Sequence, residues 1–269
     1  MTEKEQTGSR QPETVDLFMF MGQSNMAGRG IVTREHSQGA PALIQGAGYE
    51  YRAVSAPGRL HPIEEPFGRL ENRRGGIDDG DMKTGSMVTA FVNAYYEKTG
   101  IPVVGVSASK GGSRIDQWQP EEDFLNDAIA RMKAAAAFLD NSHYWIRHRF
   151  MLWCQGESDG DIGKSGEQYC REFERMLDAM QKAGIEKCFL IRIGQYNGSG
   201  EQDYGEIRAA QESIARTSEH VVLVSGLFVG MRERGLMKDE FHYYQEAYNL
   251  VGQEAGENAG ETVRTAENH

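Results

Sequence analysis

The chain has 269 residues, of which 29 are Lys or Arg and 40 are Asp or Glu, so its formal net charge is −11. This length can bury one full hydrophobic core, and we therefore expect a single domain over residues 1–269. The acidic field repels phosphate backbones and anionic lipid surfaces, which argues against nucleic acid and membranes as partners.

The ends and the cysteines indicate a compartment. The polar start MTEKEQTGSRQPET has no apolar signal region, and no later segment is apolar for long enough to span a membrane. Cys154, Cys170 and Cys188 form an odd set without CxxC spacing, which favours reduced thiols over disulfides or a zinc site. We expect a cytoplasmic protein, although a leader removed by processing would leave the same sequence.

Five short apolar runs have the composition of buried strands: residues 16–21, 103–107, 149–153, 188–193 and 221–224. Helical periodicity lies between most of them, at 87–96, 125–139, 169–180, 207–215 and 244–251. Strands that alternate with helices predict a three-layer α/β/α sandwich with a mainly parallel sheet of about five strands. In such sheets, ligands bind beyond the carboxyl ends of the strands.

Three segments do not follow this alternation. Residues 29–81 carry Gly, Pro and charge with little periodicity, and a connection of this length is usually functional or disordered. We expect it to drape over the active site as a long loop. We also expect the polar ends, residues 1–13 and 256–269, to fray.

The first predicted strand runs into Gly22-Gln23-Ser24-Asn25-Met26. Ser24 therefore lies at the carboxyl end of that strand, in a tight turn that can present its Oγ outward as a nucleophile. The alternative is that Ser24 caps a following helix, which is a common role for serine. This stretch by itself does not decide between the two.

The second predicted strand ends before Lys110-Gly111-Gly112-Ser113, followed by Arg114-Ile115-Asp116-Gln117-Trp118. Paired glycines permit close approach of the backbone and leave N–H groups free for an oxyanion or a phosphate. The phosphate-loop patterns GxxxxGK[ST] and GxGxxG are absent. The alternative is an ordinary glycine turn.

The third predicted strand ends in Gln155-Gly156-Glu157-Ser158-Asp159, a carboxamide followed by carboxylates at another carboxyl end. Acidic side chains also favour a helix N-terminus, so a structural role is the alternative. A third polar cluster at a strand end weakens that alternative, because the carboxyl ends of parallel strands meet at one edge of the sheet.

Near the C-terminus, Asp239 precedes His242 by three residues. In a turn that leads into a helix, this spacing lets the carboxylate hold Nδ1 of the imidazole and direct Nε2 toward a serine. A lone surface histidine is usually inert. Of the seven histidines, however, His242 alone has this setting.

Together, these motifs from residue 22 to residue 242 resemble the SGNH-hydrolase superfamily. More narrowly, they resemble carbohydrate esterase family six and the sialate O-acetylesterase domain, which include acetylxylan esterases. The resemblance implies a flavodoxin-like sandwich that removes acetyl groups from a sugar or oligosaccharide without a metal or other cofactor. It does not indicate an oligomeric state.

The resemblance also implies roles for individual residues. Ser24 would be the nucleophile, His242 the base and Asp239 its orienting acid, with Glu157 as a rival for that third position. The oxyanion hole would comprise the N–H groups of Ser24 and Gly112 and the side-chain amide of Gln155. Cys154 stands where relatives often have His before the Gln-Gly-Glu segment, which puts the role of that histidine in doubt.

Substrate contacts are expected from four side chains near the motifs: Gln23, Asn25, Arg114 and Trp118. Trp118 can stack on a sugar or pack in the core. The acidic balance disfavours an anionic substrate such as a sialate, unless Arg114 with Arg73 or Arg74 compensates. The alternatives are a lipase-like or thioesterase-like hydrolase of short-chain esters and a non-catalytic carbohydrate-binding protein.

Overall fold

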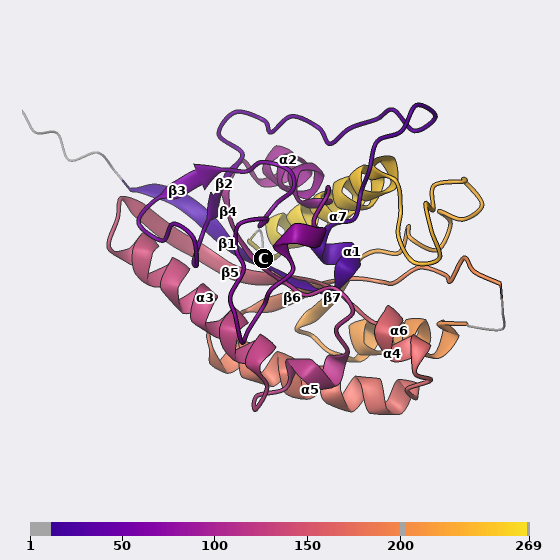
Figure 1. Ribbon diagram of the computed structural model, residues 1–269. Helices are drawn as coiled ribbons and strands as arrows, with labels where there is room; N and C mark the ends of the chain where they lie inside the picture. Colours follow the sequence, from indigo (N-terminus) through magenta and orange to yellow (C-terminus); the bar gives the residue numbers. More distant parts are fainter. Residues whose placement is uncertain (1–11, 200–202, 268–269) are drawn as a thin grey trace, which may run out of the picture.

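The computed structural model describes residues 12–199 and 203–267, which form one sheet covered by helices on both faces (Figure 1). Its strands are β1 (Glu13–Gly22), β2 (Gly48–Tyr51), β3 (Leu60–Pro62), β4 (Val103–Ser109), β5 (Tyr144–Cys154), β6 (Lys187–Ile191) and β7 (Val221–Ser225). Its helices are α1 (Ser24–Ala27), α2 (Val88–Thr99), α3 (Asp123–Asp140), α4 (Glu157–Asp161), α5 (Gly166–Lys182), α6 (Gly205–Thr217) and α7 (Gln245–Glu267), with 3₁₀ turns η1 (Gly80–Met82) and η2 (Ile115–Trp118). The predicted α/β class is confirmed.

The sheet of the described residues has seven strands in the order β3-β2-β4-β1-β5-β6-β7, and its pairs are parallel except for β2 with β3. The five predicted strands correspond to β1, β4, β5, β6 and β7. The two additional strands come from the segment 29–81. With four and three residues, they are too short to show a hydrophobic period.

β1 is the switch point of the sheet. The strands β4 and β2 follow it on one side, and β5, β6 and β7 follow it on the other. Gly22 at the end of β1 pairs with Ser109 on one side and with Cys154 on the other. The chain therefore leaves all three strands at the same edge of the sheet. An α/β sheet places its ligand site at such a switch point.

Two hydrophobic cores lie on opposite faces of the sheet, and β1 contributes to both. Leu17 and Met19 belong to the core that contains α3, α5 and α6, whereas Phe18 and Phe20 belong to the core that contains α2 and α7. All four side chains are at most 1% exposed. Burial on both faces accounts for the continuous apolar run of this strand.

The C-terminal helix α7 is longer than expected. Fraying was predicted for residues 256–269, but α7 continues to residue 267, with Ala259 and Val263 buried. Gly256 lets this part of α7 approach α2 closely, since a Cβ there would lie 2.3 Å from the carbonyl oxygen of Phe91. Because small residues make this contact, the segment has no strong apolar pattern. Residues 1–11 of the other expected frayed end lie outside the described part.

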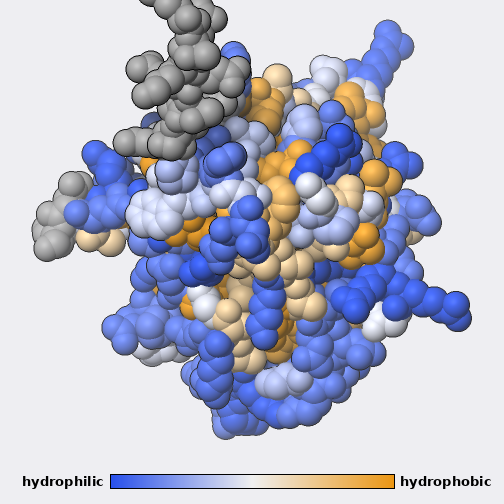
Figure 2. All heavy atoms as spheres, turned by 90° about the vertical axis from the view of Figure 1, so that its left-hand side faces the viewer, coloured by the Kyte–Doolittle hydropathy of each residue, from blue (hydrophilic) through white to orange (hydrophobic). Residues whose placement is uncertain are grey.

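The side of the molecule at the left of Figure 1 is mostly hydrophilic, with a narrow apolar strip down its middle (Figure 2). The three cysteines are free, and no helix in the described part is long and apolar enough to cross a membrane.

Candidate active site

Ser24 follows a turn that only glycine can make. Gly22 has a φ of +140°, and a Cβ there would lie 2.0 Å from the carbonyl oxygen of Cys154. The chain can therefore leave β1 beside β5 and begin α1 at Ser24. The serine is 7% exposed and lines a pocket of about 430 Å³ at the carboxyl edge of the sheet.

His242 lies between β7 and α7 in the chain and reaches the serine. Its Nε2 is 2.9 Å from Ser24 Oγ, and its Nδ1 is 3.0 Å from Asp239 Oδ2. Asp239 Oδ1 accepts the backbone N–H groups of Phe241 (2.8 Å) and His242 (2.7 Å), which fixes the carboxylate beside the ring. The spacing of three residues thus works through a local turn, and Ser24, His242 and Asp239 form one continuous chain of contacts.

The protonation states of His242 and Asp239 suit proton transfer from Ser24. Burial lowers the pKa of His242, which outweighs the opposing hydrogen bond and charge of Asp239. Burial alone would raise the pKa of Asp239, but the two backbone N–H groups and the imidazole hold it below the ordinary value. At neutral pH the imidazole is therefore neutral and able to accept a proton, while the aspartate is ionised.

Two residues of the pocket, Ser24 and Gly112, have backbone N–H groups without an acceptor among the described residues. Gly112 lines the pocket with a φ of +70°, the left-handed conformation that glycine adopts without strain. The structure brings both groups to the pocket, as an oxyanion hole requires.

Gln155 does not fit its predicted role as an oxyanion donor. It is fully buried, and its Nε2 donates to the carbonyl oxygen of Ser113 (3.0 Å) and to Asp159 Oδ2 (2.5 Å). Both amide hydrogens are thus engaged inside the protein. Gln23 offers an amide instead: its Oε1 accepts the N–H of Gly156 at 3.1 Å, and its Nε2 has no acceptor in the described part of the chain.

Glu157, the rival acid, lines the pocket but does not contact His242. Its Oε1 accepts a hydrogen bond from Asn25 Nδ2 at 2.5 Å, and its Oε2 is buried without a partner in the described residues. Burial is the main cause that raises the pKa of Glu157 to about 7. The geometry therefore favours Asp239 over Glu157 as the acid that orients the imidazole.

The predicted substrate contacts separate into pocket and interior. Gln23 lines the pocket, whereas Asn25 is 1% exposed and Trp118 is fully buried. The indole packs edge-on against Trp153, at a centroid distance of 5.4 Å, so Trp118 belongs to the core. Arg114 lies outside the pocket and pairs with Asp116 at 3.2 Å. Of the four, only Gln23 is placed to meet a ligand.

Several residues of the pocket were not predicted from the sequence: Arg29, Asp79, Met82, Lys110, Gly111, Ser158, Asp161 and Phe241. Lys110, Gly111, Ser158 and Asp161 belong to the strand-end motifs or flank them. Their position in the sequence could therefore have indicated that they line the site. Arg29 and Asp79 form an ion pair of 2.7 Å from the two ends of the segment 29–81, and no local pattern marks them. This segment reaches the pocket mainly through its ends.

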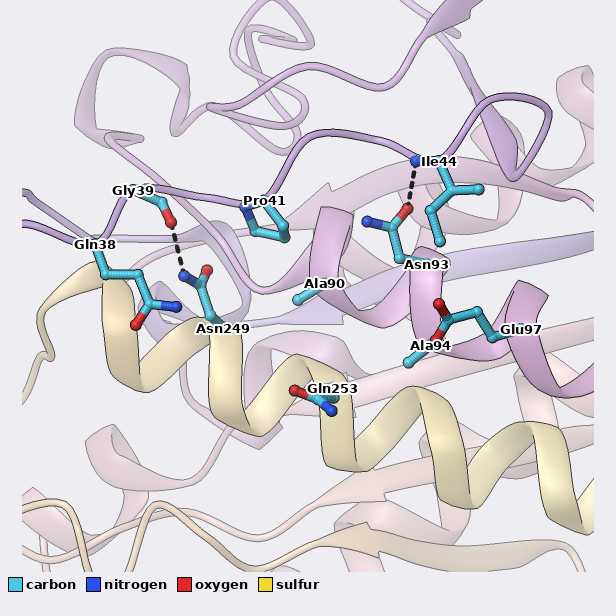
Figure 3. Close-up of a pocket in the computed structure, with 10 residues that line it drawn as sticks. All are labelled: Gln38, Gly39, Pro41, Ile44, Ala90, Asn93, Ala94, Glu97, Asn249 and Gln253. Atoms are coloured by element: carbon cyan, nitrogen blue, oxygen red, sulfur yellow. Dashed lines mark hydrogen bonds between the residues drawn. The ribbon is translucent and has the colours of Figure 1, made fainter.

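The middle of the segment 29–81 packs on α2 and α7 and does not line the active-site pocket. Residues 38–44 cross α2 and α7 and cover a second hollow of about 300 Å³ (Figure 3). Asn249 Nδ2 donates to the carbonyl oxygen of Gly39 at 2.8 Å, and Asn93 Oδ1 accepts the N–H of Ile44 at 2.8 Å. These asparagines pin the chain to the helices, and none of the predicted site residues lines this hollow.

The described residues contain no group of three or more His, Cys, Asp or Glu side chains that could hold a metal ion. The pocket itself presents the Ser24 hydroxyl, the His242 imidazole and the Gly112 backbone.

A Ser, a His and an Asp side chain in successive contact at the switch point of an α/β sheet resemble the site of serine hydrolases. The chain matches the family model described as carbohydrate esterase, sialic acid-specific acetylesterase over residues 14–260, and it belongs to this family. It is 24% identical to a probable carbohydrate esterase of Arabidopsis thaliana over 248 residues, 88% of this chain and 86% of the relative.

Solved structures share the fold. The structure of the Arabidopsis thaliana protein matches with a TM-score of 0.66 at 22% identity, over 93% of this chain and 98% of that one. The structure of NanS matches with a TM-score of 0.61 at 12% identity, over 96% and 99%. A carbohydrate acetylesterase from Xanthomonas citri matches with a TM-score of 0.57 at 12% identity, over 93% and 57%.

Proposed function

We propose that this protein is a serine esterase that removes O-acetyl groups from carbohydrates through an acetyl-enzyme intermediate. The observation that carries the proposal is the continuous contact from Ser24 Oγ through the imidazole of His242 to Asp239 Oδ2. Membership of a carbohydrate esterase family supports the reaction class.

In the first half of the reaction, Ser24 Oγ attacks the acetyl carbonyl carbon while His242 Nε2 takes the hydroxyl proton. The free N–H groups of Ser24 and Gly112 stabilise the negative charge that develops on the carbonyl oxygen. The Gln23 side chain is the third donor in this proposal, in place of Gln155. When the C–O bond breaks, His242 returns the proton to the sugar oxygen, and the acetyl group stays on Ser24.

In the second half, a water molecule attacks the acetyl-enzyme. His242 Nε2 takes a proton from this water, and the same N–H groups stabilise the second tetrahedral intermediate. Collapse of the intermediate returns the proton to Ser24 Oγ and releases acetate. Throughout, Asp239 holds the imidazole in the required tautomer and stabilises its protonated form.

The charges in the pocket favour a neutral sugar over a sialate. Arg29 pairs with Asp79 at 2.7 Å, and Lys110 lies 4.0 Å from the same aspartate. Asp161 and Glu157 add acidic groups to the lining. A substrate carboxylate would therefore meet cations that are already balanced, which lowers its binding energy.

The cationic cluster considered from the sequence does not compensate. Arg73 pairs with Asp127 at 2.9 Å and Arg114 pairs with Asp116. None of Arg73, Arg74 and Arg114 lines the pocket. We therefore propose a neutral acetylated sugar or short oligosaccharide, of the acetylxylan type or a related one, as the substrate class.

The test is acetate release from three esters by the purified protein and by Ser24→Ala: acetylated xylo-oligosaccharides, an O-acetylated sialate and a small acetyl ester. We expect Ser24-dependent release from the xylo-oligosaccharides and from the small ester, with slower release from the sialate. Preference for the sialate would overturn the neutral-sugar proposal. Activity on the small ester alone, undiminished with longer acyl chains, would instead indicate a lipase-like or thioesterase-like hydrolase.

A further inference from the structure

The turn that presents Gly112 is held by hydrogen bonds on its inner side. Ser113 Oγ donates to the carbonyl oxygen of Lys110 at 2.7 Å and closes the turn. Trp118 Nε1 donates to the same hydroxyl at 2.9 Å and ties the turn to the core. The position of the Gly112 N–H therefore depends on where Ser113 is held.

A fully buried carboxylate on α4 holds the chain just beyond this turn. Asp159 Oδ2 accepts the backbone N–H of Ile115 at 2.9 Å and Nε2 of Gln155 at 2.5 Å. The same Nε2 donates to the carbonyl oxygen of Ser113 at 3.0 Å. Asp159 thus contacts the segment after β4 once directly and once through Gln155.

The charge of this carboxylate is balanced away from the pocket. Lys164 Nζ lies 2.9 Å from Asp159 Oδ1, and its side chain is 3% exposed. Lys164 also contacts Glu172 of α5. A buried ionic group of this kind is costly unless its partners are in place, so the network defines one arrangement of its members.

We propose that Asp159 is a positioning residue that places the Gly112 N–H of the oxyanion hole by holding Ile115 directly and Ser113 through Gln155. The inference rests on the proposed function. Asp159 does not line the pocket and touches no reacting atom. Asp159 should therefore stabilise the transition state, in which the oxyanion forms, and have little effect on the affinity for the substrate.

The test is Asp159→Asn, which keeps the volume but gives the site an N–H₂ group that faces either Gln155 Nε2 or the Lys164 ammonium. We expect kcat to fall by roughly 10- to 100-fold, since an oxyanion donor is displaced rather than removed. KM should change by less than about twofold, because ground-state contacts are retained. Kinetics on the small acetyl ester measure both quantities.

A second readout reports on the oxyanion hole itself. Methylboronic acid forms a tetrahedral anionic adduct on a serine hydroxyl and so imitates the acetyl transition state. Its dissociation constant should rise in Asp159→Asn by about the same factor as kcat falls, as expected for a transition-state analogue. A role in stability alone would leave this constant unchanged in the folded fraction.

Asp127→Asn is the matched control, because Asp127 is another buried aspartate that accepts a backbone N–H, from Ile77 at 3.0 Å. It pairs with Arg131 at 2.9 Å and makes no contact with the turn at residues 110–113. We expect a comparable loss of thermal stability without a selective loss of kcat or of boronate affinity.

Equal boronate affinity in wild type and Asp159→Asn would overturn the inference, as would equal losses in Asp127→Asn. If Asp159→Asn does not fold, Gln155→Leu tests the indirect link by removing the Nε2 group that joins Asp159 to the Ser113 carbonyl oxygen. Unchanged kcat and boronate affinity in Gln155→Leu would also overturn the inference. Boronate binding needs no turnover, so an inactive wild type that binds boronate through Ser24 would count against the proposed substrate only.

Discussion

Two carboxylates lie beside the Ser24–His242 pair in contrasting environments. The Asp239 side chain is 35% exposed and accepts three hydrogen bonds, which keep its pKa below the ordinary value. Glu157 is 3% exposed, leaves one oxygen without a partner in the described part, and has its pKa raised to about 7 mainly by burial. Nearness to the nucleophile alone therefore does not assign a role to an acid.

The contacts of Glu157 suggest what a buried acid does here. Asn25 Nδ2 donates to Glu157 Oε1 at 2.5 Å and also to the carbonyl oxygen of Phe241 at 3.2 Å, next to His242. Tyr248 of α7 donates to Asn25 Oδ1 at 2.7 Å. Glu157 and Asn25 thus join α4, α1, α7 and the histidine turn, which is a structural function.

The largest effect expected from this comparison is that of Asp239→Asn. It should lower kcat by roughly 10⁴ because the amide favours the wrong imidazole tautomer. Glu157→Gln keeps an acceptor for Asn25 and touches no reacting atom, so its loss should stay below about tenfold. Steady-state kinetics on a small acetyl ester measure both. A mild effect at Asp239 beside a severe one at Glu157 would reverse the assignment.

The pH dependence of the free energy of unfolding should also distinguish Glu157 from Asp239. Its pKa of about 7 in the folded protein lies above the ordinary 4.5, so the folded state binds the extra proton between these values. Stability from this group is therefore lost as pH rises from 4.5 to 7, by about 3 kcal/mol in total. Glu157→Gln removes this dependence.

Chemical denaturation from pH 5 to pH 8 measures the effect. The free energy of unfolding of Glu157→Gln minus that of wild type should increase with pH by up to about 3 kcal/mol, because all other groups titrate alike in both proteins. Parallel curves for the two proteins would mean that Glu157 is ionised in the folded state throughout this range. Asp127→Asn is the control, because the pKa of Asp127 is lowered and this group does not titrate between pH 5 and pH 8, so its curve should run parallel to that of wild type.

The pH dependence of kcat/KM should distinguish His242 from Glu157. His242 must be neutral to act as a base, and burial holds its pKa below 6.5, so the acid limb should reach half-maximum below pH 6.5. Asp239 raises the pKa of His242, so residual activity of Asp239→Asn should show a limb at still lower pH. A limb near pH 7 that disappears in Glu157→Gln would instead assign it to Glu157.

The sequence was informative where a role depends on neighbouring residues along the chain. Ser24 follows a strand end that requires glycine at residue 22, and Asp239 reaches His242 within one turn. The alternation of strands and helices predicted the layers, and parallel pairing predicted that three strand ends meet. The turns follow from local geometry, and the layers follow from the right-handed crossovers that join parallel strands.

The sequence was less informative where a side chain can turn toward either of two neighbours. Gln155 and Trp118 lie in the expected motifs, yet both turn inward, because Ser113 and Asp159 provide hydrogen-bond partners in the interior. Their direction depends on contacts between segments that are far apart in sequence. The same holds for Arg29, whose partner Asp79 is 50 residues away.

The smallest effect is expected at Arg114, which was predicted to contact the substrate but pairs with Asp116 outside the pocket. Arg114→Ala should change KM for acetylated xylo-oligosaccharides by less than about twofold, since a half-exposed ion pair contributes little. The small acetyl ester is the internal control, because it is too short to reach beyond the pocket. A KM that rises several-fold for the oligosaccharide alone would mean that the sugar extends past the pocket rim to Arg114, and would restore the contact that the sequence suggested.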